Sequence, residues 1–255
     1  MLHLFLSPHF DDVVGSCGGT LARLRDLRAT ARIHTVFGGS PGDILSPEAQ
    51  RLHDVWGLGG DPVAVRREED REAARRLGTS ASASLIPEAL YRCDPNGQWL
   101  YPTHSSRVGP LHHSDRQLGV ALARSLAARY PGRVRFYAPL GIGQHADHRI
   151  VAGVGAVLHQ MGRRVVFYED FWYRSRGPWT PIDGLRPASC RVSRTQRERH
   201  LYAFAAYRSQ IPMLFGTTAN LAAAMSANDQ SADGNAFVER FWLPPRHQWR
   251  GTRAA

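Results

Sequence analysis

The stretch SPHFDDVV places His9, Asp11 and Asp12 directly after the apolar run LHLFL. Adjacent carboxylates repel each other, and charge taken out of water must be compensated by a partner. A bound cation would supply that compensation, so the stretch predicts a cation site at the end of a short buried strand. The alternative is that Asp11 and Asp12 only cap the helix that follows, a common role for acidic residues.

A second cluster, in QHADHR, places His145, Asp147 and His148 shortly after the apolar stretch VRFYAPLG. Two histidines and one carboxylate, His9, Asp12 and His148, form a set that catalytic zinc uses while one position stays open for water. Iron(II) is held by the same combination in some oxygenases, so the donor types leave Zn²⁺ and Fe²⁺ both open.

The other three polar residues of the two clusters then have separate expected roles. Asp11 would lie beside the metal without binding it, where it can take a proton from attacking water. His145 would face the same cavity and donate a hydrogen bond to a developing oxyanion or leaving group. Asp147 would orient one of the imidazoles from behind.

Strand and helix patterns alternate along the chain, and this positions both clusters. Strands are expected over 2–7, 31–39, 134–141 and 163–170, with a strand or extended segment at 83–92, and helices over 15–29, 67–78, 115–130, 148–162 and 195–210. This order predicts an α/β fold, a Rossmann-like, mainly parallel sheet with helices on both faces. Both clusters follow strands, at the carboxyl ends where such sheets bind ligands. We expect one domain over 1–255, irregular from about residue 171.

The two glycines of SCGGT fit neither a P-loop nor a dinucleotide fingerprint. Gly18 and Gly19 are therefore expected to let the first helix pack closely on the sheet.

Composition narrows the class of partner. The net charge is +10, yet all 32 basic residues are Arg and none is Lys, and no basic block of five or more occurs. The signature of nucleic-acid binding is therefore weak. The three Cys residues are far apart and indicate neither a disulfide framework nor a Cys-based zinc site. No leader or apolar stretch of membrane-spanning length is evident, so a cytoplasmic protein without membrane association is expected.

The paired blocks PHFDD and HADH, about 130 residues apart, resemble those of the zinc-dependent N-deacetylases of the PIG-L, or LmbE-like, family. The resemblance extends through REEDREAARRLG, YRCD, FYED and YRSQ, roughly the first 210 residues. It implies zinc ligation by His9, Asp12 and His148, with Asp11 as general base and His145 stabilising the oxyanion.

The resemblance also implies substrate contacts by an Arg before the second helix and by an Asp after the third strand. Arg66 and Asp94 are the nearest matches, with Arg67 and Arg71 as competitors for the first role.

The sequence departs from the family pattern at positions that are not metal ligands. Phe10 and Val13 stand where many members have Pro and Glu, and Gly143 stands where some members have a Tyr that assists with the oxyanion. His145 would then carry more of that role, unless Tyr101 or Tyr173 takes the place of the missing Tyr.

These features predict a metal-dependent hydrolase that removes an N-acetyl or related N-acyl group from an amino sugar or a sugar-containing small metabolite. Antibiotic intermediates are among the family's substrates, and a soluble glycoside in a biosynthetic pathway is the expected partner. One alternative is a catalytically inactive sugar-binding protein on the same fold. Another is a basic nucleic-acid-binding protein. Salt-dependent binding, and an activity that chelators do not change, would support this alternative.

Overall fold

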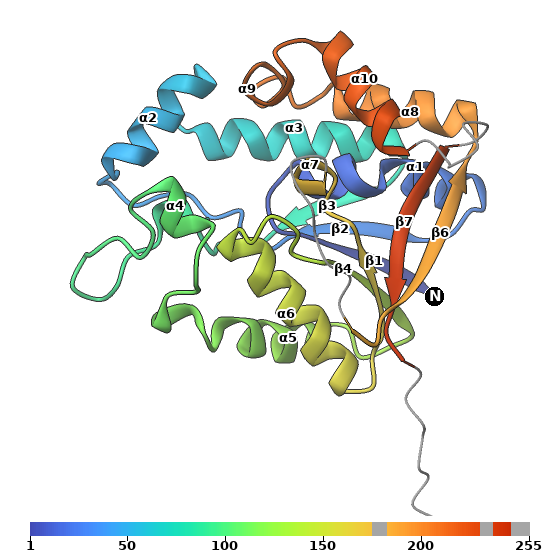
Figure 1. The fold of residues 1–255 in the computed structure, drawn as a ribbon, viewed down its shortest axis with the longest axis horizontal. Helices are drawn as coiled ribbons and strands as arrows, with labels where there is room; N and C mark the ends of the chain where they lie inside the picture. Colours follow the sequence, from blue (N-terminus) through green and yellow to red (C-terminus); the bar gives the residue numbers. More distant parts are fainter. Residues whose placement is uncertain (175–182, 230–236, 246–255) are drawn as a thin grey trace, which may run out of the picture.

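A seven-stranded sheet runs through the molecule, and the computed structural model describes residues 1–174, 183–229 and 237–245 (Figure 1). The strands are β1 (Leu2–Ser7), β2 (Ala31–Thr35), β3 (Ser80–Ala83), β4 (Val134–Pro139), β5 (Arg164–Tyr168), β6 (Arg186–Val192) and β7 (Phe237–Leu243). Their order is β3-β2-β1-β4-β5-β7-β6. The pairings among β1 to β5 are parallel, whereas β7 runs antiparallel to both β5 and β6. The predicted α/β fold with a mainly parallel sheet is confirmed.

Helices cover both faces of this sheet. They are α1 (Asp12–Asp26), α2 (Pro47–Trp56), α3 (Pro62–Leu77), α4 (His104–Arg107), α5 (Leu118–Arg129), α6 (Ala146–Gln160), α7 (Phe171–Arg174), α8 (Arg194–Phe204), α9 (Ile211–Phe215) and α10 (Thr218–Asp229), with 3₁₀ turns η1 (Ala89–Tyr91) and η2 (His113–Asp115). In Figure 1, α1, α3 and α8 lie on one side of the sheet and α5 and α6 on the other. Hydrophobic side chains accordingly pack into two main clusters, one on each face.

Strand β1 shows why the two clusters form. Phe5 points into the cluster under α1 and α3, while Leu4 and Leu6 point into the cluster under α5 and α6. All three side chains are fully buried. Successive side chains of a strand face opposite sides, so a strand covered on both faces reads as a continuous apolar run.

The helix that the sequence places at 67–78 is longer at its amino end. Asp61 caps α3 by accepting a hydrogen bond from the Ala64 backbone, and Pro62 is its first residue. The helix ends, as expected, at Gly78, which has a left-handed backbone with φ of 71°.

Several boundaries differ from the sequence expectations. Helix α1 begins at Asp12, three residues before the expected start, and ends at Asp26, three residues before the expected end at residue 29. Strand β3 lies at Ser80–Ala83, just before the expected segment 83–92, which instead contains η1. The sequence also missed α2 and the antiparallel strands β6 and β7. Most side chains of β6 are exposed and most of β7 are half-buried, so neither strand has the fully buried apolar run of a central strand.

Within the described residues, no helix combines the length and apolar character needed to span a membrane.

Candidate metal centre and catalytic pocket

The two predicted clusters meet at the place where the strand order reverses. The chain leaves β1 toward β2 on one side, and β4 pairs with β1 on the other. The loops after β1 and β4 therefore diverge and leave a crevice between them, the usual ligand site of doubly wound sheets. The first loop carries His9 and Asp11 and leads into Asp12, the first residue of α1, and the second leads into His145 and α6.

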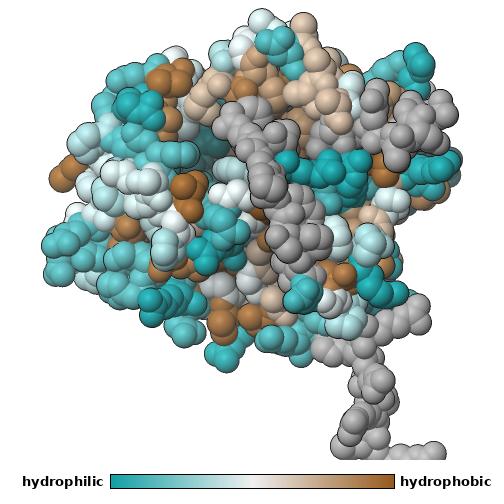
Figure 2. Space-filling view, viewed as in Figure 1, coloured by the Kyte–Doolittle hydropathy of each residue, from teal (hydrophilic) through white to brown (hydrophobic). Residues whose placement is uncertain are grey.

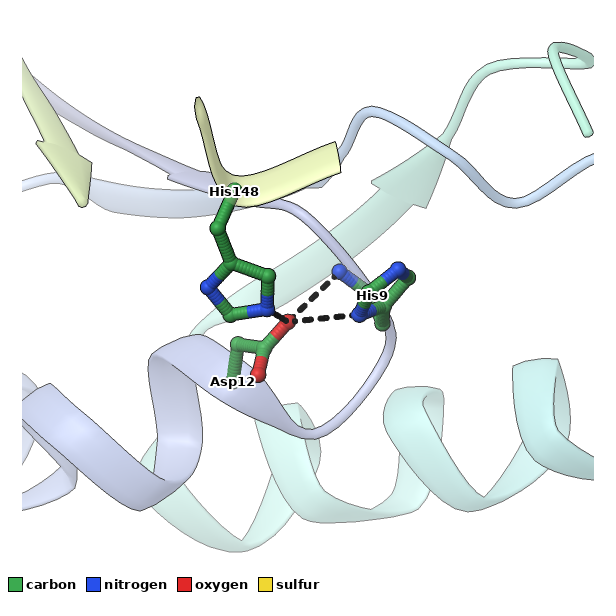
Figure 3. Close-up of side chains that lie close together, drawn as sticks. All are labelled: His9, Asp12 and His148. Carbon is green, nitrogen blue, oxygen red and sulfur yellow. Dashed lines mark hydrogen bonds and ion pairs between the residues drawn. The ribbon is translucent and has the colours of Figure 1, made fainter. Parts of the chain in front are cut away.

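Two imidazole side chains, those of His9 and His148, converge on one carboxylate oxygen of Asp12 in this crevice (Figure 3). Oδ2 of Asp12 lies 3.2 Å from Nδ1 of His9 and 3.2 Å from Nε2 of His148. The same oxygen accepts a 2.8 Å hydrogen bond from the backbone N–H of His9. The predicted ligand atoms are thus close enough to surround one cation, and the three residues form a cluster suited to a metal ion.

The second nitrogen of each histidine is held by another carboxylate. Nε2 of His9 lies 2.9 Å from Asp147, and Nδ1 of His148 lies 2.6 Å from Asp170. Such carboxylate–histidine pairs fix the ring orientation of metal-binding histidines. Asp147 therefore contacts the ring nitrogen of His9 that does not face Asp12. This position fits the orienting role that the sequence predicts for it. Asp170, which belongs to the quoted FYED stretch, was not assigned a role from sequence.

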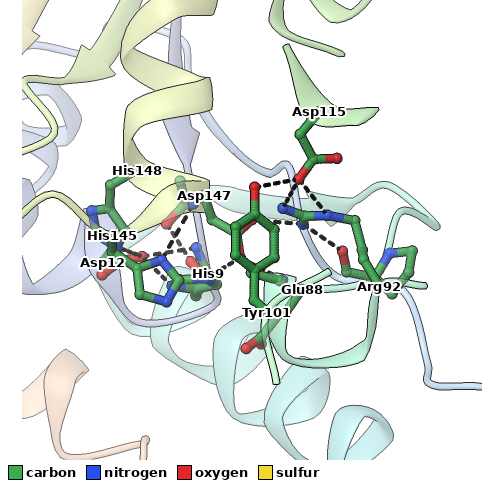
Figure 4. Close-up of polar contacts among 12 residues, drawn as sticks. His9, Asp12, Glu88, Arg92, Tyr101, Asp115, His145, Asp147 and His148 are labelled. Atoms are coloured by element: carbon green, nitrogen blue, oxygen red, sulfur yellow. Dashed lines mark hydrogen bonds and ion pairs between the residues drawn. The ribbon is translucent and has the colours of Figure 1, made fainter. Parts of the chain in front are cut away.

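Asp147 is itself fixed by a buried ionic network (Figure 4). Its carboxylate accepts hydrogen bonds from the Ala89 backbone and from Arg92, at 2.8 and 2.6 Å. The Arg92 guanidinium is shared with Asp115, which also accepts from the Tyr101 hydroxyl. The positive charge of Arg92 and the hydrogen bond from His9 lower the pKa of Asp147, against the effect of burial, so Asp147 stays ionised.

The loop before α6 is fixed by the same carboxylate that holds His148. Gly141, Gly143 and Gln144 all have positive φ angles, which fold the GIGQ segment tightly. Asp170 accepts hydrogen bonds from the backbone N–H groups of Gly141 and Ile142. One side chain after β5 therefore contacts both this loop and a candidate metal-binding histidine.

Asp11 lies beside the cluster and lines the pocket, as expected of a residue that acts next to a metal. It precedes α1, but its side chain makes no capping hydrogen bond, so capping does not explain it. Burial and the adjacent charge of Asp12 raise the pKa of Asp11 to about 6. A carboxylate with this elevated pKa is a better proton acceptor than an ordinary one.

His145 also lines the pocket, with its ring 5.0 Å from that of His9. Its Nδ1 accepts a hydrogen bond from the Asp147 backbone N–H at 3.3 Å. Burial, with the neighbouring His9 and His148, lowers the pKa of His145 well below its usual value, so the ring is neutral. A neutral ring that accepts at Nδ1 carries its proton at Nε2, where it remains a donor.

Tyr173, and not Tyr101, occupies the space beside Gly143. A Cβ added at Gly143 would lie 2.2 Å from the Tyr173 ring, which also lines the pocket and packs edge-on against His148. The Tyr101 hydroxyl is instead hydrogen-bonded to Asp115, away from the lining residues.

The two candidate substrate contacts differ in position. Arg66 is buried on the pocket wall, where it pairs with Glu88 at 2.5 Å and lies over the Trp56 ring. Asp94 does not line the pocket; its carboxylate accepts from the backbone of Asn96 and Gln98 within a turn. The geometry favours the first assignment and gives the second a local structural role instead.

The pocket that contains these groups has a volume of about 300 Å³, enough for a sugar ring. Sequence reasoning did not single out several of its lining residues, namely Leu52, Trp56, Glu88, Leu90, His104, Arg107, Gln210, Met213 and Leu214. Most of them come from the short helices α2, α4 and α9, which the sequence analysis did not predict as separate elements.

Comparisons with known proteins point to one family. The family model described as "PIG-L: GlcNAc-PI de-N-acetylase" matches residues 4–158. A 2'-N-acetylparomamine deacetylase of Niallia circulans is 30% identical over 239 residues, covering 85% of this chain and 83% of the relative.

Two solved structures agree with this result over nearly the whole chain. A deacetylase–bog complex from the biosynthesis pathway of teicoplanin is 29% identical, with a TM-score of 0.84 over 95% of this chain and 97% of that one. The zinc-inhibited form of teicoplanin deacetylase is 28% identical, with a TM-score of 0.83 and the same coverage of both chains.

Proposed function

Because the chain belongs to the PIG-L family, we propose that it is a metal-dependent N-deacetylase that removes the acetyl group from an amino sugar of an antibiotic intermediate. The observation that carries this proposal is the convergence of His9, Asp12 and His148 beside Asp11 in a sugar-sized pocket. The relatives support the substrate class, since one deacetylates 2'-N-acetylparomamine and others belong to teicoplanin biosynthesis.

We propose that a divalent cation, zinc or iron(II), is held by His9, Asp12 and His148. Nε2 of His148 is buried yet makes no hydrogen bond of acceptable geometry to any described residue, although Asp12 lies only 3.2 Å away. An unsatisfied buried nitrogen is costly, and a metal ion would satisfy it. When bound, the cation would lower the pKa of water and polarise the amide carbonyl.

Asp11 acts as the general base in this proposal. Its carboxylate, in its ionised form, accepts a proton as water attacks the carbonyl carbon of the acetamido group. When the C–N bond breaks, Asp11 returns the proton to the departing nitrogen. The products are acetate and the free amino sugar, and Asp11 ends in its starting state.

His145 stabilises the oxyanion as a neutral donor through Nε2–H. A preorganised donor of this kind typically contributes a few kcal/mol to lowering the barrier. Tyr173 is the tyrosine placed to assist, because its ring lines the pocket at Gly143. Asp147 orients His9 through its hydrogen bond, and we assign Arg66 to the sugar.

The test measures acetate release from N-acetylglucosaminides and 2'-N-acetylparomamine by the wild type, Asp11→Asn and Asp94→Asn. We expect Asp11→Asn to bind metal normally but to lose activity by a factor of about 10² to 10⁴. Asp94→Asn, which changes a carboxylate outside the pocket, should stay near wild type. Metal is titrated from substoichiometric levels, because one relative is described in a zinc-inhibited form.

Full activity of Asp11→Asn, or activity that survives complete metal removal, would contradict the mechanism. Sugar binding without acetate release would favour the inactive sugar-binding alternative. A cytoplasmic location stays a prediction from the sequence.

A further inference from the structure

The catalytic pocket extends to a wall whose residues play no part in the chemistry described above. Leu52 and Trp56 of α2, with Met213 and Leu214 of α9, give this wall an apolar part. Figure 2 shows hydrophobic colours gathered at the top of the molecule, over α9 and α10. The apolar part of the pocket wall suits the apolar face of a ring carried by the substrate.

A positively charged group lies in the same wall. Arg107, on the short helix α4, is only 6% exposed and lines the pocket. Its Nη2 donates to Glu48 at 2.9 Å. Its Nη1 is buried without a hydrogen-bond partner among the described residues. A buried guanidinium N–H without an acceptor is costly, and a ligand oxygen would satisfy it.

The charge of Arg107 is only partly neutralised by the protein. Glu48 also pairs with Arg51, whose side chain is 58% exposed. One carboxylate thus serves two guanidinium groups, so Glu48, Arg51 and Arg107 together carry one net positive charge. Glu48 stays ionised, because the hydrogen bonds from Arg51 and Arg107 lower its pKa to about 2.

The described pocket lining offers no spare carboxylate for a cationic substrate. Its acidic residues are Asp11, Asp12 and Glu88. Glu88 is paired with Arg66 at 2.5 Å, and the two aspartates belong to the reaction. A polyamine bound at the Arg107 wall would meet like charge without a partner, which costs affinity.

Resting on the proposed function, we propose that Arg107 binds a carboxylate on the part of the substrate that the reaction leaves unchanged. The substrate is then an N-acetylated amino sugar joined to an apolar, acidic aglycone, with the aglycone against α2 and α9 and its carboxylate at α4. Arg107 is the residue that sets this specificity.

The test uses aryl N-acetyl-β-D-glucosaminides that differ only in the aryl substituent: hydrogen, carboxylate or aminomethyl, the last two at the meta and para positions. Acetate release gives kcat/KM for wild type, Arg107→Met and Arg51→Met. At one of the positions, we expect wild type to favour carboxylate over aminomethyl by about 10-fold or more, since a charge-assisted hydrogen bond contributes roughly 1.5 kcal/mol or more. Arg107→Met should lose most of that preference, and Arg51→Met should keep it.

Glu48→Gln provides a variant with the opposite expected sign. Removing the neutralising carboxylate should increase the ratio of kcat/KM for the carboxylate glycoside to kcat/KM for the aminomethyl glycoside. If Arg107→Met fails to fold, this variant tests the role of Arg107 instead. The proposal is overturned if wild type shows no preference for carboxylate at either position, or if the preference survives in Arg107→Met or falls in Glu48→Gln.

Failure of the proposed function is distinguishable from failure of this inference. Acetate from the unsubstituted phenyl glycoside tests deacetylation, whereas the charge ratio tests Arg107. If none of the glycosides is cleaved, their dissociation constants measured by calorimetry give the same ratio for binding, with the same expected and contradicting outcomes.

Discussion

At the scale of single residues, each candidate metal-binding histidine uses its two nitrogens differently. His9 turns Nδ1 toward Asp12 and Nε2 toward Asp147, while His148 turns Nε2 toward Asp12 and Nδ1 toward Asp170. The supporting carboxylates fix which ring nitrogen faces the cation. If these histidines bind a metal, we expect its affinity to depend also on Asp147 and Asp170, which do not contact it.

Asp170→Asn tests this dependence. The amide cannot offer an anionic oxygen to Nδ1 of His148, so we expect metal affinity to fall by about 10- to 100-fold. Competition with a chelating dye measures the change. Glu169→Gln is the matched control: it alters the adjacent carboxylate, which pairs with Arg174 and Trp242, and should leave metal affinity near wild type. Equal affinities for the two variants would contradict the role given to Asp170.

The sequence could single out His9, Asp12 and His148 as candidate ligands because they lie in two compact blocks, each just after an apolar strand. Asp170 gives no such signal, since a single carboxylate after a strand has many ordinary roles. Arg107 was equally hard to predict, because nothing in a loop sequence indicates burial. Asp94 was assigned by family resemblance alone, and the turn around it uses its carboxylate locally.

At the scale of elements, α1 packs against α8 through a glycine. The sequence suggested that Gly18 and Gly19 let α1 approach the sheet. Gly19 does face Val192 of β6 and Glu239 of β7, but Gly18 faces the buried ring of His200 in α8. This contact could not be predicted, because the helix that supplies His200 lies far along the chain.

Gly18→Ala and Gly153→Ala should have opposite effects on stability. Alanine normally stabilises a helix interior relative to glycine, by roughly 0.5 to 1 kcal/mol. At Gly153 in α6 an added Cβ meets nothing within 4 Å, so we expect this gain. At Gly18 the Cβ would lie 2.1 Å from the His200 ring, and overpacking should lower the free energy of unfolding by about 1 to 3 kcal/mol. Denaturant unfolding measures both, and a stabilised Gly18→Ala would show that His200 moves freely.

Asp70 links α3 to two other parts of the chain. Its carboxylate accepts hydrogen bonds from Tyr207, after α8, and from Thr35 at the end of β2. Burial, partly offset by these bonds, raises the pKa of Asp70 to about 7. The folded state thus holds the proton more tightly than the unfolded chain, where an aspartate has a pKa near 4.

Asp70→Asn should therefore change how stability depends on pH. The contribution from protonated Asp70 is complete below about pH 4 and is lost as pH rises through about 7. Asparagine cannot ionise, so the variant should gain stability relative to wild type between pH 5 and pH 8, by a few kcal/mol at most. Unfolding at both pH values measures this. Glu68→Gln, on the same helix with a 72% exposed side chain, is the control. The argument would be contradicted if the difference in unfolding free energy between Asp70→Asn and wild type were the same at pH 5 and pH 8.

Among the elements, the central parallel strands were predictable because a strand that is buried on both faces has a continuous apolar sequence. Helix α2 was missed because the stretch that leads into it, SPGDILSPEAQ, is rich in Pro and Gly and resembles a loop. Ser46 caps the helix, Pro47 is its first residue, and Gly57 ends it. Since α2 supplies part of the pocket wall, the chemistry could be predicted from sequence but the specificity could not.

At the scale of the whole molecule, the candidate metal centre joins two segments far apart in the sequence. His9 and Asp12 lie at the β1–α1 junction, and His148 lies on α6, which packs on the other face of the sheet. Asp147 and Asp170 tie the same place to Arg92 and to the end of β5. A bound cation would therefore connect segments that enclose the sheet from both sides.

Metal removal should for this reason lower the stability of the entire fold. A ligand that binds only the folded state adds about 2.7 kcal/mol at 100 times its dissociation constant, which for a chain of this length raises Tm by about 5 to 10 °C. We expect chelation to reverse that rise and His148→Ala to abolish the response. His113→Ala, which removes an exposed histidine, should keep it. If Tm were independent of metal in the wild type, or if His148→Ala still responded, the cation would be bound elsewhere, and the three-residue centre would be wrong.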